Sequence, residues 1–224
     1  MNVKIRAVLF DVGGTLIKSL PAPEIHKRIL EAHGIRVTLD AVAKAHAQNQ
    51  REFDPQKMGK EGSKYWIAWN VRLLENLGIN ADKEFLSRKI DELWWDYSDL
   101  QTFPNAREVL DELRKREIKL GIVTNGLERD LQHIFKKVDI GAYFDVVVAA
   151  DTCCNAKPKC EIFRYALNKL NVRPEEALYV GDSYEYDFQG AKKAGLKSLL
   201  IDRSQNIHPC AETIDNLNRI FDYI

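Results

Sequence analysis

The chain has no excess of charge of either sign and no long apolar run. Its 33 lysine and arginine residues are balanced by 33 aspartate and glutamate residues. Nucleic-acid-binding proteins usually carry a basic excess or a basic block, so this balance argues against a nucleic-acid partner and favours a small molecule. No stretch approaches the roughly 20 apolar residues that a membrane-spanning helix needs, so we expect no membrane partner.

The sequence also has little of what marks a secreted protein. The first apolar run, residues 7–10, is too short for the apolar part of a signal peptide and ends at Asp11. Four cysteines in 224 residues do not make a disulfide scaffold, and their spacing fits no zinc-site pattern. We therefore expect a cytoplasmic protein, either a monomer or a homodimer. We assign no function to the cysteines, which are Cys153, Cys154, Cys160 and Cys210.

Five short apolar runs predict buried strands. Each is rich in valine, isoleucine, leucine or phenylalanine and lacks polar alternation, as expected when both faces of a sheet are covered. Strand and helix patterns alternate from Pro104 onward, which is typical of a doubly wound parallel sheet. The predicted strands are residues 5–10, 119–123, 144–149, 177–180 and 196–201, and the predicted helices are residues 106–116, 127–138 and 160–170.

A long helical stretch separates the first predicted strand from the others. Residues from Pro21 to Leu100 show helix signals and no strand signal. Capping residues and glycines divide this stretch into four helices with short connections, which suits an antiparallel bundle. The four predicted helices are residues 24–33, about 40–50, 63–77 and 83–97. We therefore expect an α/β protein, with a Rossmann-like core of residues 1–16 and 101–224 and an inserted four-helix-bundle cap of residues 17–100.

All four tryptophans fall within the predicted bundle. As large side chains on helices, they are expected to serve mainly as bundle core. Adjacent residues cannot share one face of a helix, so at least one of the neighbouring pair is expected to point toward the core domain or the cleft. The tryptophans are Trp66, Trp69, Trp94 and Trp95.

A carboxylate at the end of the first strand is the first candidate catalytic group. Asp11 closes the apolar run and is followed, one residue later, by Gly13 and Gly14. Open α/β sheets bind ligands at the carboxyl ends of their strands, and glycines let the backbone turn sharply beside a bound group. A strand-end aspartate that only starts a turn is the alternative at this position.

Two more acidic residues follow the predicted strand of residues 177–180. Asp182 comes almost directly after it, and Asp187 lies five residues further on. If the fold brings both to Asp11, the three charges repel one another in a poorly hydrated crevice, and a divalent cation resolves that repulsion. Carboxylate oxygens are the ligands that Mg²⁺ prefers, so the pattern indicates a magnesium site. Helix capping is the alternative role of Asp187.

Polar groups follow two other predicted strands. Thr124 and Asn125 end one of them, and Lys157 follows the next. The hydroxyl and the amide can donate hydrogen bonds to an anionic oxygen. The lysine can neutralise charge on a nucleophile or on a transferring phosphoryl group. Loop threonines and lysines are usually only solvated, but four polar signals at successive strand ends support one another.

The order of these motifs resembles that of the haloacid dehalogenase-like hydrolase superfamily. The chain contains, in order, Asp-x-Gly-Gly-Thr-Leu, Val-Thr-Asn-Gly, Lys-Pro and Val-Gly-Asp-Ser-x-x-x-Asp. The resemblance implies a C1-type helical cap and a phosphatase that forms an aspartyl-phosphate, with Mg²⁺ as cofactor. It implies catalysis by Asp11, Thr124 and Lys157, phosphate binding by Thr124, Asn125 and Lys157, and metal binding by Asp11, the backbone carbonyl of Gly13, Asp182 and Asp187, the last as a ligand or close by.

Gly13 departs from the pattern of the family's phosphatases, which usually carry a second aspartate here as general acid and base. Losing a positioned acid–base group typically costs about 10²–10⁴-fold in rate. The enzyme can use leaving groups that need little protonation, as in acyl or aryl phosphates. A cap residue can supply the proton, with His26 and His46 as the nearest histidine candidates and a surface helix position as their alternative role. The reaction can also be one other than the hydrolysis of a phosphate monoester.

Three other functions are also compatible with a glycine at position 13. Haloacid dehalogenases also lack the second aspartate, but their metal-free site does not require a pair such as Asp182 and Asp187. Phosphonate-cleaving relatives use a cap lysine to form a Schiff base; Lys57, Lys60 and Lys64 lie in or beside the cap, and nothing singles one out. A catalytically weak protein that binds a phosphorylated ligand is the third alternative. The first choice is a Mg²⁺-dependent phosphatase of a small phosphorylated metabolite, with the cap loop of residues 53–62 shaping the leaving-group site.

Overall fold

The computed structural model of the chain describes residues 3–203 and 210–224. Six strands form one sheet in the spatial order β5-β4-β1-β6-β7-β8, and every neighbouring pair runs parallel. The strands are β1 (Ala7–Phe10), β4 (Lys119–Val123), β5 (Val146–Val148), β6 (Ala177–Gly181), β7 (Lys197–Ile201) and β8 (Thr213–Ile214). The strand that precedes Asp11 therefore lies in the middle of the sheet.

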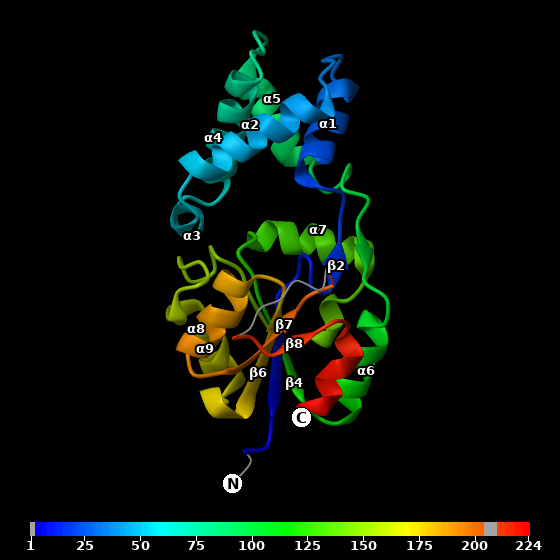
Figure 1. The fold of residues 1–224 in the computed structure, drawn as a ribbon, viewed down its shortest axis with the longest axis vertical. Coiled ribbons are helices and arrows are strands. Elements are labelled where there is room, and N and C mark those ends of the chain that lie inside the picture. Colours follow the sequence, from blue (N-terminus) through cyan, green and yellow to red (C-terminus); the bar gives the residue numbers. More distant parts are fainter. Residues whose placement is uncertain (1–2, 204–209) are drawn as a thin grey trace.

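Helices cover both faces of this sheet (Figure 1). They are α6 (Ala106–Lys115), α7 (Glu128–Val138), α8 (Cys160–Leu170) and α9 (Gly190–Lys193). Along β1, Val8 and Phe10 pack on the side of α6 and α7, whereas Ala7 and Leu9 pack on the side of α8 and α9. All four side chains are fully buried. This two-sided burial explains the unbroken apolar runs and confirms the predicted Rossmann-like, doubly wound sheet.

The predicted core strands and helices are present, and their ends differ from the prediction by at most two residues. The sequence pattern missed the strand β8, the 3₁₀ helix Leu217–Asp222, and an antiparallel pair formed by β2 (Ile17–Lys18) and β3 (Gln101–Thr102). Strands of two residues show no periodicity from which they could be predicted.

The segment between β2 and β3 is helical, as predicted. Its helices are α1 (Ala22–Ala32), α2 (Leu39–Glu52), α3 (Met58–Glu61), α4 (Ser63–Asn76) and α5 (Lys83–Leu93). Figure 1 shows them gathered at one end of the molecule, with α3 at the side of the insert that faces the sheet. The exact division into domains at residues 17 and 100 stays a prediction. Residues 1–2 and 204–209 of the predicted core lie outside the described residues.

Local sequence signals explain where the inserted helices begin and end. The Thr38 hydroxyl accepts a hydrogen bond from the Ala41 backbone N–H at 3.2 Å, and Asp82 caps α5 in the same way. Gly34 and Gly78 end helical segments with φ angles of 79° and 67°. The short α3 was expected as loop. It follows a 3₁₀ turn, Pro55–Lys57, in which Asp54 accepts the Gln56 N–H at 2.9 Å.

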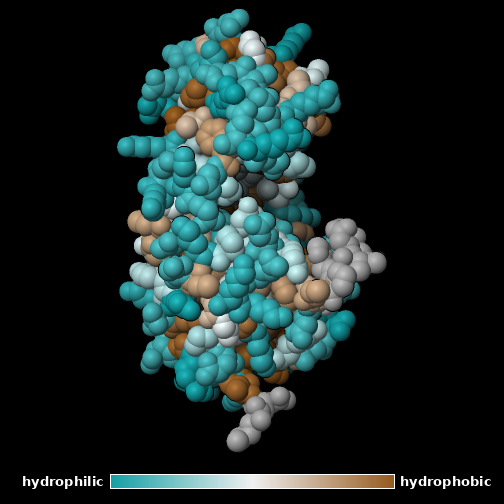
Figure 2. All heavy atoms as spheres, turned by 60° about the vertical axis from the view of Figure 1, so that its left-hand side comes forward, coloured by the Kyte–Doolittle hydropathy of each residue, from teal (hydrophilic) through white to brown (hydrophobic). Residues whose placement is uncertain are grey.

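The surface in Figure 2 is mostly hydrophilic and is hollowed between the helical insert and the sheet-bearing part. Within the described residues, no helix combines the length and apolar character needed to cross a bilayer. The four cysteines are free thiols.

Candidate active site

Three neighbouring strands end side by side at the centre of the sheet. β1 is in register with β4 and β6, so that Phe10 lies opposite Ile122 and Val180. Asp11, the next residue, donates its backbone N–H to the Val180 carbonyl at 2.9 Å. The residues just beyond these strand ends therefore meet at one edge of the sheet, where open α/β sheets bind ligands.

Lys157 lies at the centre of the buried polar groups. Its Nζ donates to Asp11 Oδ1 at 2.6 Å and to Asp187 Oδ1 at 2.6 Å, and it lies 3.1 Å from the Tyr179 hydroxyl. Burial opposes the positive charge, but Asp11 and Asp187 outweigh it and raise the pKa of Lys157 above its usual range. The lysine is therefore a fixed cation that touches the candidate nucleophile.

Three carboxylates converge beside this lysine. One oxygen each from Asp11, Asp182 and Asp187 lie within 4.8 Å of one another. Burial, opposed by Lys157 and reinforced by Asp187 and Asp182, raises the pKa of Asp11 to about 7. Partial burial and the neighbouring Asp187 raise the pKa of Asp182 to about 6. Lys157 and, near Asp182, Arg203 thus leave the pKa values of Asp11 and Asp182 raised, and the arrangement favours an additional cation.

The three carboxylates differ in the partners they already have. Asp187 Oδ1 accepts from Lys157 and, at 2.9 Å, from the Tyr179 hydroxyl, while its Oδ2 accepts from the Ser183 backbone N–H at 2.9 Å. Both of its oxygens are therefore engaged by the protein. Asp182 is exposed at the open side of the cluster, and only one oxygen of Asp11 bonds to Lys157. Asp11 and Asp182 are thus better placed to bind a metal ion directly than Asp187.

Two glycines make room for these carboxylates. A Cβ on Gly14, whose φ is +74°, would lie 2.0 Å from Asp182 Oδ2, and a Cβ on Gly181 would lie 2.3 Å from Asp187 Cγ. Any side chain at either position would displace an acidic group. Gly13 is different, because a Cβ there would have no heavy atom within 4 Å.

Thr124 and Asn125 lie at the same edge but have different partners. The Thr124 Oγ1 accepts the Gly126 backbone N–H at 3.1 Å, which leaves the hydroxyl hydrogen to donate elsewhere. The Asn125 amide binds the backbone of Lys157 on both sides, accepting from its N–H at 2.6 Å and donating to its carbonyl at 3.2 Å. In this structure Asn125 holds the lysine in place, and its predicted contact with phosphate stays a prediction.

The insert contacts the core on two sides of the site. On one side Gln56 donates to the Lys157 carbonyl at 3.3 Å, and a Cβ on Gly59 of α3 would lie 2.8 Å from the Ala150 carbonyl oxygen. On the other side Arg129 of α7 pairs with Asp91 of α5 at 2.5 Å. These contacts bring the insert over the carboxyl ends of the strands.

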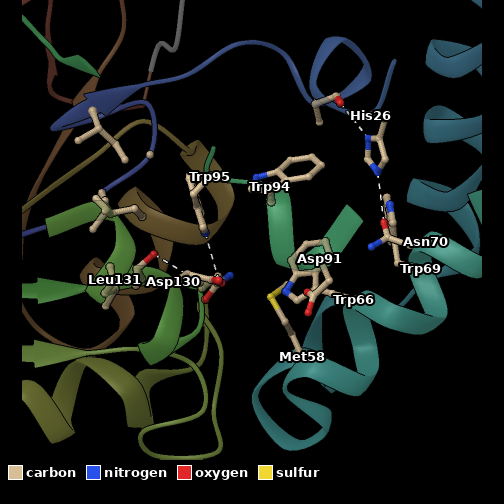
Figure 3. A pocket seen from close by; sticks show the side chains of 18 of the residues that line it. His26, Met58, Trp66, Trp69, Asn70, Asp91, Trp94, Trp95, Asp130 and Leu131 are labelled. Carbon is tan, nitrogen blue, oxygen red and sulfur yellow. Dashed lines mark hydrogen bonds between the residues drawn. The ribbon is translucent and has the colours of Figure 1, made fainter. Parts of the chain in front are cut away.

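A cavity of about 390 Å³ lies between the two parts, with Trp94 and Asp130 among its lining residues (Figure 3). Its lining also includes Gly13 and Thr124.

All four tryptophans line this cavity, and only Trp69 among them is buried. Trp66, Trp69 and Trp94 nevertheless pack in the apolar clusters of the insert, so the expectation of bundle-core tryptophans is confirmed for these three. Trp95 packs against the apolar cluster of the sheet-bearing part, which confirms that one of the neighbouring pair points toward the core domain.

The histidine candidates of the cap line the cavity, whereas the lysine candidates do not. His26 is 2% exposed, with Nδ1 2.8 Å from the Ala22 carbonyl and Nε2 3.2 Å from Asn70 Oδ1. Burial lowers its pKa to about 4, so it is neither a surface residue nor a protonated acid near neutral pH. His46 is half-buried and lines the cavity. The lysines are exposed and do not line it: Lys57, Lys60 and Lys64.

Tyr179 and Arg203 belong to the site and were not predicted. Tyr179 is fully buried, and its hydroxyl contacts Lys157 and Asp187. Arg203 donates to the Gly14 carbonyl and, at 2.9 Å, to the Thr15 carbonyl, so it supports the loop that follows Asp11. A tyrosine in an apolar strand looks like a core residue, and no motif surrounds Arg203.

Comparison with known proteins identifies the family of this chain. A family model described as haloacid dehalogenase-like hydrolase matches residues 5–195. Pyrophosphatase PpaX of Bacillus velezensis is 32% identical over 205 residues, which cover 87% of this chain and 82% of that protein. Glyceraldehyde 3-phosphate phosphatase of Methanopyrus kandleri is 30% identical over 205 residues, covering 90% and 85%. The HAD-hydrolase YfnB of Bacillus subtilis, solved with magnesium bound, shares the fold, with a TM-score of 0.82, 24% identity and 98% coverage of both chains. By its motifs, fold and relatives, this chain belongs to the haloacid dehalogenase-like hydrolases.

Proposed function

We propose that this hydrolase is a Mg²⁺-dependent phosphatase that acts on a small phosphorylated metabolite through an aspartyl-phosphate on Asp11. The contact of 2.6 Å between buried Lys157 and Asp11 is the main support, because it sets a fixed cation beside a carboxylate at the ligand-binding edge of the sheet. Relatives named as phosphatases, such as those of Bacillus velezensis and Methanopyrus kandleri, support the same reaction class.

The oxygen donors of the acidic cluster fit Mg²⁺, which prefers carboxylate and carbonyl oxygens. Asp11, Asp182 and the Gly13 carbonyl would hold the ion, with Asp187 beside them. When bound, Mg²⁺ would stabilise negative charge on the phosphoryl oxygens. The same ion would favour the ionised form of Asp11, whose pKa is otherwise raised to about 7 by burial.

The chain's own residues suggest how the two steps proceed. The Asp11 carboxylate attacks phosphorus, and the bond from phosphorus to the leaving-group oxygen breaks. Lys157 and the Thr124 hydroxyl donate to the phosphoryl oxygens, while Asn125 holds the Lys157 backbone in position. Water then hydrolyses the aspartyl-phosphate and restores the carboxylate. Gly13 supplies no proton to the leaving group.

The helical insert completes this proposal. We propose residues 17–100 as a cap that covers the strand ends and excludes bulk water from the aspartyl-phosphate. Its contacts with Lys157 through Gln56, and with Arg129 through Asp91, would hold it over the site.

Turnover of para-nitrophenyl phosphate with Mg²⁺ tests the proposal. We expect EDTA to abolish activity and Asp11→Asn to lower kcat by more than about 10³-fold, as loss of a nucleophile usually does. Asp40→Asn, at an exposed position of α2, is the matched control and should keep wild-type activity. Absence of turnover across a broad set of phosphate esters would leave a ligand-binding protein as the better explanation. Chloride release from 2-chloropropionate without metal would instead identify a dehalogenase.

A further inference from the structure

The cavity beside the candidate nucleophile has an aromatic wall on its insert side. Trp66 and Trp69 come from α4, and Trp94 and Trp95 directly follow α5. In Figure 3 these rings lie around the space between α4, α5 and the core, with Met58 at one side. Flat rings and a thioether are suited to an aromatic ligand, which can pack face-on or edge-on against them.

Three polar side chains of this wall, His26, Asn70 and Asp130, already have hydrogen-bond partners. His26 lies 3.2 Å from Asn70, whose amide also donates to the Ser87 carbonyl at 3.3 Å. Asp130 accepts the Trp95 indole N–H at 3.1 Å (Figure 3).

Within the described residues the indole N–H groups of Trp66, Trp69 and Trp94 have no hydrogen-bond partner, so the free polar groups of the tryptophans are donors. A sugar or polyol would also need an acceptor for each of its hydroxyl hydrogens, whereas an aromatic ring needs none.

The charges around the cavity argue against an anionic leaving group. Asp91 and Asp130 are in its lining, and of the described residues that line it none is a lysine or an arginine. Asp91 is paired with Arg129, so the local charge is compensated but not positive. A diphosphate or carboxylate held here would lack a cationic partner and would face two acidic residues.

The cavity is open next to the reacting groups. Gly13 and Thr124 both contribute to its lining, and a Cβ on Gly13 would meet nothing within 4 Å. A side chain at this lining position would therefore begin in open space. A leaving group in the cavity would lie beside Val12 and Gly13, the two residues that follow Asp11, where the chain offers no acid.

We propose that the substrates are phosphate monoesters of uncharged aromatic alcohols, with the aromatic ring in this cavity against the tryptophans. The inference rests on the proposed phosphatase function. When Asp11 attacks phosphorus, the electron pair of the broken bond passes to the aryl oxygen, whose charge spreads into the ring, and solvent supplies the proton afterwards. An aryl oxide needs less protonation than an alkoxide, which suits a site with glycine in the acid position.

The test compares 2-naphthyl phosphate, phenyl phosphate and pyrophosphate with Mg²⁺. The two aryl leaving groups have similar acidity, so a difference in KM reports binding of the larger ring. We expect KM for 2-naphthyl phosphate to be several-fold lower than for phenyl phosphate, and pyrophosphate to be a poor substrate. In Trp94→Ala and Trp66→Leu, the ratio of kcat/KM for 2-naphthyl phosphate to that for acetyl phosphate should fall roughly tenfold. Phe85→Ala, an exposed aromatic of α5, should keep the wild-type ratio.

Calorimetry that measures the binding of 2-naphthol to the Asp11→Asn variant tests the aromatic site without any turnover. It therefore separates this inference from the proposed function. Binding of 2-naphthol that Trp94→Ala weakens supports the aromatic site even if no phosphate ester is hydrolysed. Turnover of phosphate esters with equal KM for the two aryl substrates, and no 2-naphthol binding, would overturn the aromatic site and leave the phosphatase proposal standing. Efficient hydrolysis of pyrophosphate in preference to aryl esters would also overturn it.

Discussion

At the scale of residues, the two glycines that follow Asp11 are under different packing constraints. Packing enforces the second of these glycines, because a Cβ on Gly14 would lie 2.0 Å from Asp182 Oδ2. No such constraint acts on Gly13, which has open space where a Cβ would project. Packing therefore does not require glycine at position 13, and a side chain there could be added without displacing the acidic cluster.

Gly13→Asp should restore a general acid at the mouth of the cavity. Because the side chain has room, we expect the variant to fold, and to raise kcat/KM for glycerol 3-phosphate by as much as about 10²-fold, near the low end of general acid–base effects. The gain for para-nitrophenyl phosphate should be much smaller, since its leaving group needs little protonation. Gly13→Asn, of similar size but without a titratable proton, is the control and should show no gain. Equal acceleration of both substrates by Gly13→Asp would contradict a missing acid.

Individual residues were predictable where their role follows from position along the chain. Asp11, Thr124 and Asp182 each come just after an apolar strand, and parallel strands bring such residues together. Tyr179 could not be predicted, because only the folded structure shows that its hydroxyl meets Lys157 rather than apolar neighbours. The catalytic and metal-binding roles of the predicted residues stay predictions.

At the scale of elements, a buried polar contact joins three helices of the insert. His26 of α1 meets Asn70 of α4, and Asn70 donates to the Ser87 carbonyl of α5. Apolar packing surrounds these groups, with Ile25 and Ile29 of the same α1 in the insert's core. The contact orients α1 against α4, and it also makes the insert sensitive to protonation of one imidazole.

We expect the insert to lose stability on acidification through His26. Burial lowers the pKa of His26 from 6.5 to about 4. Between these values the unfolded chain binds a proton that the folded chain does not, so stability is full above about pH 6.5 and falls toward pH 4. The difference amounts to about 3 kcal/mol.

Urea unfolding measures the free energy of unfolding at pH 7 and at pH 4. Between these two pH values, His26→Gln should lose about 3 kcal/mol less of it than the wild type. His133 is exposed, so His133→Gln should lose as much stability as the wild type. If His26→Gln also lost as much stability as the wild type between pH 7 and pH 4, His26 would not be the responsible group.

Helices were predicted correctly where local capping residues and hydrophobic periodicity determine them. A helix was missed where contacts between distant segments determine the structure. Thr38 and Asp82 start their helices with the side-chain caps that their sequence suggests. The α3 segment was expected as loop, because four residues show no helical period. Its place follows from packing against the core, where Gly59 approaches the Ala150 carbonyl too closely for any side chain.

For the whole molecule, the candidate site exists only when distant parts of the chain meet. Lys157 and Asp11 are 146 positions apart, and the insert closes over them from a third segment. An ion held by Asp11 and Asp182 therefore binds the folded chain and not the unfolded one. Such binding adds its free energy to global stability.

Mg²⁺ should consequently raise the melting temperature. At about 100 times its Kd, a ligand specific for the folded state adds about 2.7 kcal/mol, which corresponds to roughly 5–10 °C for a chain of this size. Asp182→Asn should abolish the shift without lowering the metal-free melting temperature, because it removes a repelling charge from the cluster. Asp215→Asn, an exposed position far along the chain, should keep the full shift, and NaCl of matched ionic strength should not reproduce it. A Mg²⁺ shift that persists in Asp182→Asn would mean that the ion acts elsewhere, and that Lys157 and Arg203 compensate these carboxylates without a metal ion.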